Sequence, residues 1–233
     1  MKCERIPLGA QGAYLDTYFL ADSPELKAGA CRPAVVVCPG GGYAYTSDRE
    51  AEPIALALCA RGFHACVLRY PCAPARFPAA LRALAEAVAW VRAGAAENHV
   101  DPRQISVCGF SAGGHLAGSL GVFWNAPFLA AETGLALQDM RPDKMVLCYP
   151  VITGGEFAHK GSFDNLLGAD ADAARRAEVS LEQHVTQDTP PAFLWHTYTD
   201  PGVPVENTML FAMALRRAGV PFESHIYSVG GHG

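Results

Sequence analysis

The chain has 233 residues, about the size of one α/β domain, and half of them are hydrophobic, enough to cover a sheet on both faces. Its formal net charge of −5 is spread along the sequence, without a basic stripe, which argues against nucleic acid or a membrane surface as partner. No apolar stretch reaches membrane-spanning length and the N-terminus lacks a secretory signal, so we expect a cytoplasmic protein. Small-molecule substrates fit this balance better, and the oligomeric state is left open.

Two weak strands are predicted near the N-terminus, around residues 5–8 and 14–20. From residue 34 onward, short apolar runs alternate with helical segments, the pattern of βα units that build a parallel sheet. The predicted fold class is therefore α/β, with a mostly parallel central sheet and helices on both faces, in a single domain over residues 1–233. The later strands are expected at residues 34–38, 63–69, 104–108, 144–149, 192–196 and 221–228.

Helices are predicted between these strands. Ser47 is followed three residues later by Glu50, the pattern of a capping box, so a helix is expected to begin at Ser47 and end at residues 61–62. Over residues 81–91, apolar positions recur every three or four residues and predict a helix that faces the core. The last helix, about residues 206–218, ends in two arginines and a glycine.

The eight cysteines are irregularly spaced, and four of them lie within or at the end of predicted strands: Cys38, Cys66, Cys108 and Cys148. This placement favours buried thiols over disulfides. There is no Cys-x-x-Cys and no pair of histidines on one helix face, so no metal site is predicted.

Residues 109–113 read Gly-Phe-Ser-Ala-Gly and directly follow the predicted strand 104–108. A helix-forming run comes next, which gives the strand, sharp turn and helix that expose a nucleophilic serine above a sheet. We therefore interpret Ser111 as the nucleophile; a glycine-rich turn with an incidental serine is the alternative.

A serine nucleophile needs an imidazole to accept its proton and an acid to orient that imidazole. His232 follows the last predicted strand on a glycine-rich loop and is the predicted base. His196 is the alternative base, and we also expect it to line the substrate site, whereas His115 is expected to be structural. Asp200 opens the turn after strand 192–196 and is the predicted acid; Glu206, the alternative, is expected to start the next helix.

The developing oxyanion needs preorganised donors. Three glycines follow strand 34–38, and we expect the N–H of Gly41 or Gly42, with that of Ala112, to form the oxyanion hole. A phosphate cradle is the alternative, but the chain has no Gly-Lys-Ser/Thr and no Gly-x-Gly-x-x-Gly. Tyr43 and the segment 157–165 are expected to shape the substrate pocket.

Four segments together resemble the acetyl esterase/lipase group of the α/β-hydrolases, particularly bacterial acetylxylan and feruloyl esterases and, more distantly, the hormone-sensitive-lipase-like esterases. They are residues 39–43; 70–81; 109–115; and 200–204 with 230–233. The resemblance implies cofactor-free hydrolysis of small acyl esters, acetyl esters first, with a small molecule or oligosaccharide as the alcohol. An amidase or formamidase on the same fold and a non-catalytic hydrolase-fold binding protein are the alternatives.

Two positions depart from that group. The oxyanion motif often begins with His, and Pro39 stands there in this chain. Such enzymes also usually continue past the catalytic histidine into a further helix, whereas this sequence has one residue after His232. We therefore expect the domain as given to lack that helix.

Overall fold

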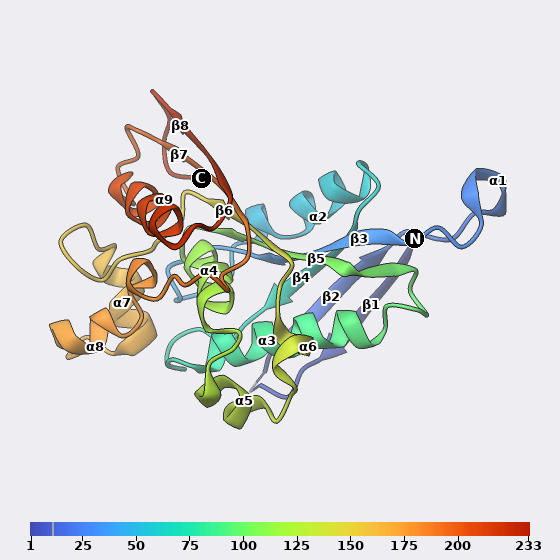
Figure 1. Ribbon diagram of the computed structural model, residues 1–233, viewed down its shortest axis with the longest axis horizontal. Coiled ribbons are helices and arrows are strands. Elements are labelled where there is room, and N and C mark those ends of the chain that lie inside the picture. Colours follow the sequence, from blue (N-terminus) through green and yellow to red (C-terminus); the bar gives the residue numbers. More distant parts are fainter. Residues whose placement is uncertain (11) are drawn as a thin grey trace.

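Eight strands form one sheet in the computed structural model, which describes residues 1–10 and 12–233 (Figure 1). The strands are β1 (Lys2–Pro7), β2 (Tyr14–Phe19), β3 (Arg32–Cys38), β4 (His64–Arg69), β5 (Val100–Phe110), β6 (Lys144–Cys148), β7 (Ala192–Thr197) and β8 (Phe222–Tyr227). Their order across the sheet is β1-β2-β4-β3-β5-β6-β7-β8. The β1/β2 and β2/β4 pairs are antiparallel and the rest are parallel, which confirms the predicted mostly parallel sheet.

The helices are α1 (Pro24–Lys27), α2 (Glu52–Cys59), α3 (Ala79–Ala93), α4 (Ala112–Phe123), α5 (Pro127–Thr133), α6 (Leu137–Met140), α7 (Lys160–Leu167), α8 (Ala173–Ala177) and α9 (Glu206–Ala218). Two 3₁₀ turns lie at Asp48–Glu50 and Leu181–Gln183. The expected helices over residues 81–91 and 206–218 are confirmed as α3 and α9, and α9 ends at Gly219 in the left-handed conformation, with φ of +74°.

The two faces of the sheet bury two separate sets of side chains. On β3, Val35 and Val37 point to the face covered by α2, whereas Ala34 and Val36 point to the face covered by α3, α4 and α9. This alternation is the period of two that a strand imposes on its side chains. Figure 1 shows α2 on one side of the sheet and α3 and α4 on the other. The four cysteines expected within strands are buried.

The predicted capped helix that begins at Ser47 is wrong at its start. Ser47 makes no side-chain capping bond, the segment Asp48–Glu50 is a 3₁₀ turn, and α2 begins only at Glu52. The reason lies in Glu50, whose carboxylate does not turn back to Ser47 but accepts the N–H of Gly40 at 2.7 Å.

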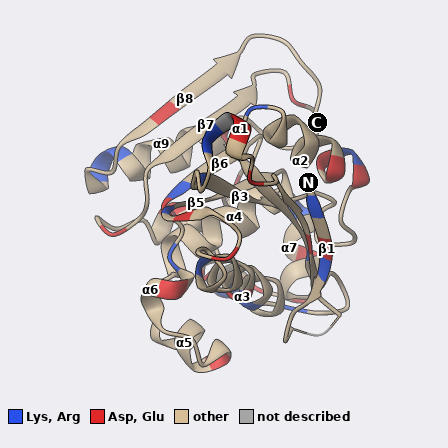
Figure 2. Cartoon of the chain, turned by 90° about the vertical axis from the view of Figure 1, so that its right-hand side faces the viewer, with Lys and Arg blue, Asp and Glu red and all other residues tan. Residues whose placement is uncertain are grey.

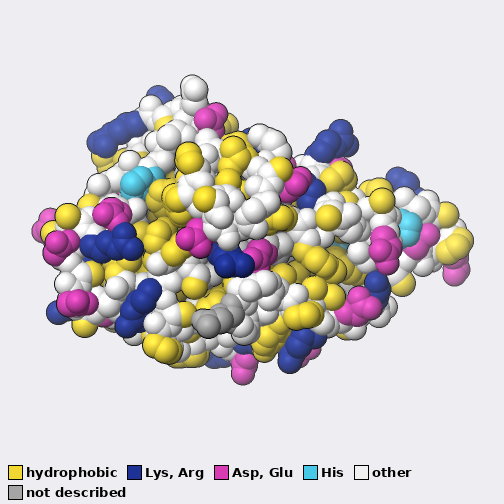
Figure 3. Space-filling view, turned by 90° about the horizontal axis from the view of Figure 1, so that it is seen from below, with side chains coloured by type: hydrophobic (Ala, Val, Ile, Leu, Met, Phe, Trp, Pro, Cys, Tyr) yellow, Lys and Arg dark blue, Asp and Glu magenta, His cyan; other side chains and the backbone are white. Residues whose placement is uncertain are grey.

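Acidic and basic residues of the chain are scattered over its elements (Figure 2), and hydrophobic side chains are interspersed with both signs of charge on the face seen from below (Figure 3). Among the helices of residues 1–10 and 12–233, none is long and apolar enough to cross a membrane.

Candidate active site

Ser111 occupies a sharp turn between β5 and α4. Its φ of +54° is rare for a residue with a side chain, and the turn is held by bonds from its N–H to the Cys148 carbonyl and from the Val151 N–H to its own carbonyl, both at 3.0 Å. Gly109 and Gly113, which flank the turn, must be glycines because backbone carbonyl groups lie too close to them for a side chain. A Cβ on Gly109 would lie 2.0 Å from the Gly113 carbonyl oxygen, and one on Gly113 would lie 2.0 Å from the Cys38 carbonyl oxygen. The turn therefore stands against the ends of β3 and β6.

The structure brings Ser111, His232 and Asp200 into one hydrogen-bonded series. The Nε2 of His232 lies 2.8 Å from the Oγ of Ser111, and its Nδ1 lies 2.7 Å from the Oδ2 of Asp200. The three residues are 121 and 32 positions apart in the sequence, so the fold, not local structure, assembles them. Glu206, the alternative acid, is the first residue of α9.

Asp200 is held as a charged carboxylate. Burial, which leaves its side chain 0 % exposed, raises the pKa of this carboxyl, but the N–H of Val203, the His232 ring and the N–H of Gly202 donate to it and bring the pKa below its ordinary value. The two backbone bonds are 2.9 and 2.8 Å long and both reach Oδ1, which leaves Oδ2 free to face His232. An ionised Asp200 fixes the imidazole so that Nε2 can accept the serine proton.

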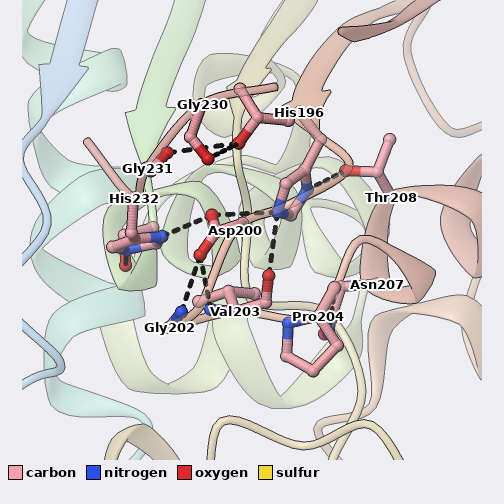
Figure 4. Close-up of polar contacts among 12 residues, drawn as sticks. His196, Asp200, Gly202, Val203, Pro204, Asn207, Thr208, Gly230, Gly231 and His232 are labelled. Carbon is pink, nitrogen blue, oxygen red and sulfur yellow. Dashed lines mark hydrogen bonds and ion pairs between the residues drawn. The ribbon is translucent and has the colours of Figure 1, made fainter. Parts of the chain in front are cut away.

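His196 does not lie where we expected it. Its ring is 0 % exposed, with Nδ1 2.8 Å from the hydroxyl of Thr208 and Nε2 3.0 Å from the carbonyl of Val203 (Figure 4). The same Nε2 is 3.3 Å from the Oδ2 of Asp200, and burial lowers the pKa of His196. The residue therefore supports Asp200 from behind and neither lines a substrate pocket nor reaches Ser111.

The loop after β3 presents backbone amides beside Ser111. Gly41 and Gly42 have φ of +127° and +63°, and their N–H groups donate to no other group among residues 1–10 and 12–233. The N–H of Ala112 is the first of α4, one of the amides that a helix leaves without an internal partner. These are the three amides that the sequence predicted for the oxyanion hole, and the helix dipole adds positive potential at the last of them.

Tyr43 also points away from its expected place. It is 3 % exposed, has φ of +59°, and its hydroxyl lies 2.8 Å from the Nδ1 of His115. The other nitrogen of His115 lies 2.8 Å from the carbonyl of Val179, and burial lowers the pKa of His115 to about 4. Tyr43 thus packs beneath the glycine loop with the structural histidine that the sequence predicted, rather than facing a substrate.

A family model described as BD-FAE matches residues 21–215 of the chain. The chain belongs to the BD-FAE family. The chain is similar to a solved structure, the acetyl ester-xyloside bifunctional hydrolase from Caldicellulosiruptor lactoaceticus. The two are 40 % identical in sequence and superpose with a TM-score of 0.89 over 99 % of this chain and 87 % of the other. The chain has the α/β-hydrolase fold: an α/β-hydrolase from a deep-sea metagenome library, 33 % identical, superposes on all of it with a TM-score of 0.78.

The names of two curated relatives of this BD-FAE family member refer to xylan. The chain is 37 % identical to endo-1,4-beta-xylanase B of Butyrivibrio fibrisolvens over 87 % of its own length and 32 % of the relative's. It is 30 % identical to the acetylxylan esterase of Xylanibacter ruminicola over 92 % of its own length and 42 % of the relative's. The chain therefore spans between about a third and half of the length of these proteins.

A cleft of about 280 Å³ opens beside Ser111 and is lined mainly by polar groups and glycines. It includes Tyr45, 61 % exposed, Arg49 and His159, none of which the sequence singled out, although His159 falls in the expected segment 157–165. His159 faces the cleft from the start of α7, where its Nδ1 bonds the hydroxyl of Ser162 at 2.8 Å. Burial, and next the charge of His232, lower the pKa of His159.

A larger groove of about 560 Å³ lies at the start of the parallel strands and contains none of the predicted site residues. The smaller cleft holds both Ser111 and His232, so we place the site there. Among the described residues, no group of three His, Cys, Asp or Glu side chains is arranged to hold a metal ion.

Proposed function

We propose that this BD-FAE family member is a serine carboxylic-ester hydrolase that removes small acyl groups, acetyl first, from carbohydrate esters. The observation that carries the proposal is the hydrogen-bonded series Ser111, His232 and Asp200, with distances of 2.8 and 2.7 Å. A nucleophile, a base and an orienting acid in this order are the parts that acyl transfer requires.

In the proposed reaction, His232 removes the proton of Ser111 as its Oγ attacks the ester carbonyl. The negative charge that develops on the carbonyl oxygen is stabilised by the amides of Ala112 and of Gly41 or Gly42. Asp200 stabilises the imidazolium, which then protonates the leaving alcohol. Water, activated by the same imidazole, releases the acyl group and restores Ser111.

The size and lining of the cleft support a small acyl group. At about 280 Å³ it is at the small end for ligand sites, and glycines and polar side chains line it rather than the apolar surface that a long acyl chain needs. The names of the xylanase, the acetylxylan esterase and the acetyl ester-xyloside hydrolase support acetylated xylo-oligosaccharides as the substrate class.

The test measures release of acetate from acetylated xylo-oligosaccharides and of nitrophenol from acetyl, butyryl and octanoyl nitrophenyl esters. We expect turnover to fall with acyl length and to drop about a million-fold, to the detection limit, in Ser111→Ala. Ser119→Ala is the matched control, because Ser119 lies on α4, which begins directly after Ser111, and among residues 1–10 and 12–233 its hydroxyl bonds only His115. Its activity should equal that of the wild type.

Two results would contradict the proposal. If formanilide is hydrolysed faster than every ester in the panel, the amidase alternative replaces it. If the folded protein shows no Ser111-dependent turnover of any ester or amide but binds acetylated oligosaccharides, the chain is a binding protein.

A further inference from the structure

Glu50 is a buried carboxylate that the proposed reaction does not use. It is 8 % exposed, and each oxygen accepts one hydrogen bond: Oε2 from the N–H of Gly40 and Oε1 from the hydroxyl of Tyr149, both at 2.7 Å. Tyr149 lies 99 positions away in the sequence. One side chain therefore links the loop that follows β3 to the residue that follows β6.

The Gly40 end of this link determines where the oxyanion loop stands. The N–H of Gly40 is bound by Glu50, and its carbonyl accepts the N–H of Ser47 at 2.9 Å, so both of its polar groups are tied to the segment 47–50. A Cβ on Gly40 would lie 2.7 Å from the Glu50 carboxylate and 3.1 Å from the Cβ of Ser111. Gly40 is thus held between Glu50 and the nucleophile, directly before the amides of Gly41 and Gly42.

The Tyr149 end of the link reaches the base. The ring of Tyr149 meets that of His232 edge to face, with centroids 5.0 Å apart, and meets Trp195 at the same distance on another side. Its backbone has φ of +37° and donates its N–H to the Trp195 carbonyl at 2.7 Å. The bond from the Tyr149 hydroxyl to Glu50 fixes the ring against which the imidazole rests.

We propose that Glu50 is a positioning residue of the active site, which holds the oxyanion loop through Gly40 and the imidazole of His232 through Tyr149. The inference rests on the proposed function, since it assigns Glu50 to the geometry of the same reaction. Glu50 also borders the cleft, but both of its oxygens are bound to Gly40 and Tyr149, so it acts by keeping donors and base in register with Ser111.

The test compares Glu50→Ala with Glu50→Gln. In Glu50→Ala both links are lost, and we expect kcat to fall about a hundredfold while KM changes less than about threefold. Misplaced donors and a misplaced base reduce the stabilisation of the transition state more than they reduce substrate binding. In Glu50→Gln the amide oxygen can accept from Gly40 and the amide nitrogen can donate to the Tyr149 oxygen, so kcat should recover to within about fivefold of the wild type.

Glu86→Ala is the matched control. Glu86 is a half-buried carboxylate on α3 that likewise accepts a backbone N–H, from Ala10 at 3.0 Å, far from the cleft. It should lower the melting temperature and leave kcat unchanged. Tyr149→Phe should lower kcat about tenfold in the wild type and have no further effect in Glu50→Ala, because the shared bond is already gone.

The proposal is overturned if Glu50→Ala keeps wild-type kcat, or if Gln and Ala variants lose equal activity while both remain folded. A crystal structure of Glu50→Ala is the readout that does not depend on turnover. It should show the loop 39–43 displaced from Ser111 and the Tyr149 ring turned from His232; unchanged positions contradict the proposal. Absence of Ser111-dependent turnover in the parent protein would instead contradict the proposed function.

Discussion

Ser111 and His232 lie 2.8 Å apart, yet the two regions that carry them are stabilised in different ways. All twelve residues of α4, which begins directly after Ser111, are buried, and the sheet closes on the turn through glycine contacts. On the side of His232, all six residues of β8 are exposed. There the loop depends on hydrogen bonds, chiefly from the hydroxyls of Thr197 and Thr199 to the backbone of Gly230 and Gly231.

Because the two regions are stabilised differently, substitutions in them should affect the stability and the activity of the protein differently. Substitutions around Ser111 change side-chain volume in a packed core, where the loss or gain of a single methyl group changes the free energy of unfolding. Changes around His232 remove mainly polar contacts, so that little apolar area is lost. We therefore expect substitutions on the side of His232 to reduce catalysis while the protein stays folded, and substitutions beneath Ser111 to reduce stability.

Asp200→Asn gives the largest expected effect on the side of His232. Because both backbone donors bind Oδ1, the asparagine oxygen should take that place and direct its NH₂ at the Nδ1 of His232. That donor forces the imidazole proton onto Nε2, where it can no longer accept from Ser111. We expect kcat to fall about ten-thousand-fold, or ~5.5 kcal/mol, with a melting temperature close to that of the wild type.

Asp143→Asn is the control for that substitution. Asp143 accepts the N–H of Ile105 at 2.8 Å and pairs with Arg92, away from the cleft. It should lower the melting temperature with kcat unchanged. The contrast between the two regions fails if Asp200→Asn unfolds the protein and Asp143→Asn does not.

His115 tests the packed side through pH. Burial lowers its pKa to about 4 in the folded protein, against about 6.5 in the unfolded chain. Above pH 6.5 both states are neutral; as pH falls from about 6.5 to about 4, only the unfolded chain takes up the proton, so stability is lost over that window. The contribution of His115 to this loss is about 3 kcal/mol, measured by urea unfolding at several pH values as the difference between the wild type and His115→Asn.

In His115→Asn the loss over this pH window should be smaller, although the variant is less stable than the wild type at pH 7.5. His225→Asn, which replaces an exposed histidine on β8, is the control at a position outside the packed side. Parallel curves for wild type and His115→Asn would mean that another group causes the acid sensitivity.

Thr199→Val should have the smallest effect. The hydroxyl of Thr199 donates to the Gly230 carbonyl and accepts the Gly230 N–H, both at 3.0 Å, and the residue is exposed. Its loss loosens the loop before His232, and we expect kcat to fall about tenfold, ~1.4 kcal/mol, with stability changed by less than about 0.5 kcal/mol.

Thr133→Val removes a similar hydroxyl, bonded to Leu129 and Leu135 at the end of α5. Its kcat should not change. Equal kcat in Thr199→Val and the wild type would show that the loop is held without this hydroxyl.

The parts of the site that could be predicted are those that local sequence determines. The turn at Ser111 has a signature because the close approaches of Gly109 and Gly113 tolerate no side chain, and strand order places Asp200 and His232 at the ends of β7 and β8. Most strands were predicted to within two residues for the same reason: their apolar runs are local.

The rest depended on partners far along the chain. Tyr43 turns inward because its φ is positive and its hydroxyl bonds His115, which lies 72 positions away in the sequence. His196 is buried and bonds Thr208 and Val203. The apparent capping pattern at Glu50 misled because the carboxylate bonds the N–H of Gly40 and the hydroxyl of Tyr149 instead of the N–H of Ser47. No period or motif indicates such contacts.

The distance of 121 residues between Ser111 and His232 also matters for the order in which the chain is made. The elements around the serine can pack while the polypeptide is still growing, but the base takes its place only after β8, which follows them in the chain, has paired with β7. A nascent or partly folded chain therefore carries its nucleophile in an inert form. The proposed turnover therefore requires β8 to be paired with β7, so that activity reports the docking of this strand.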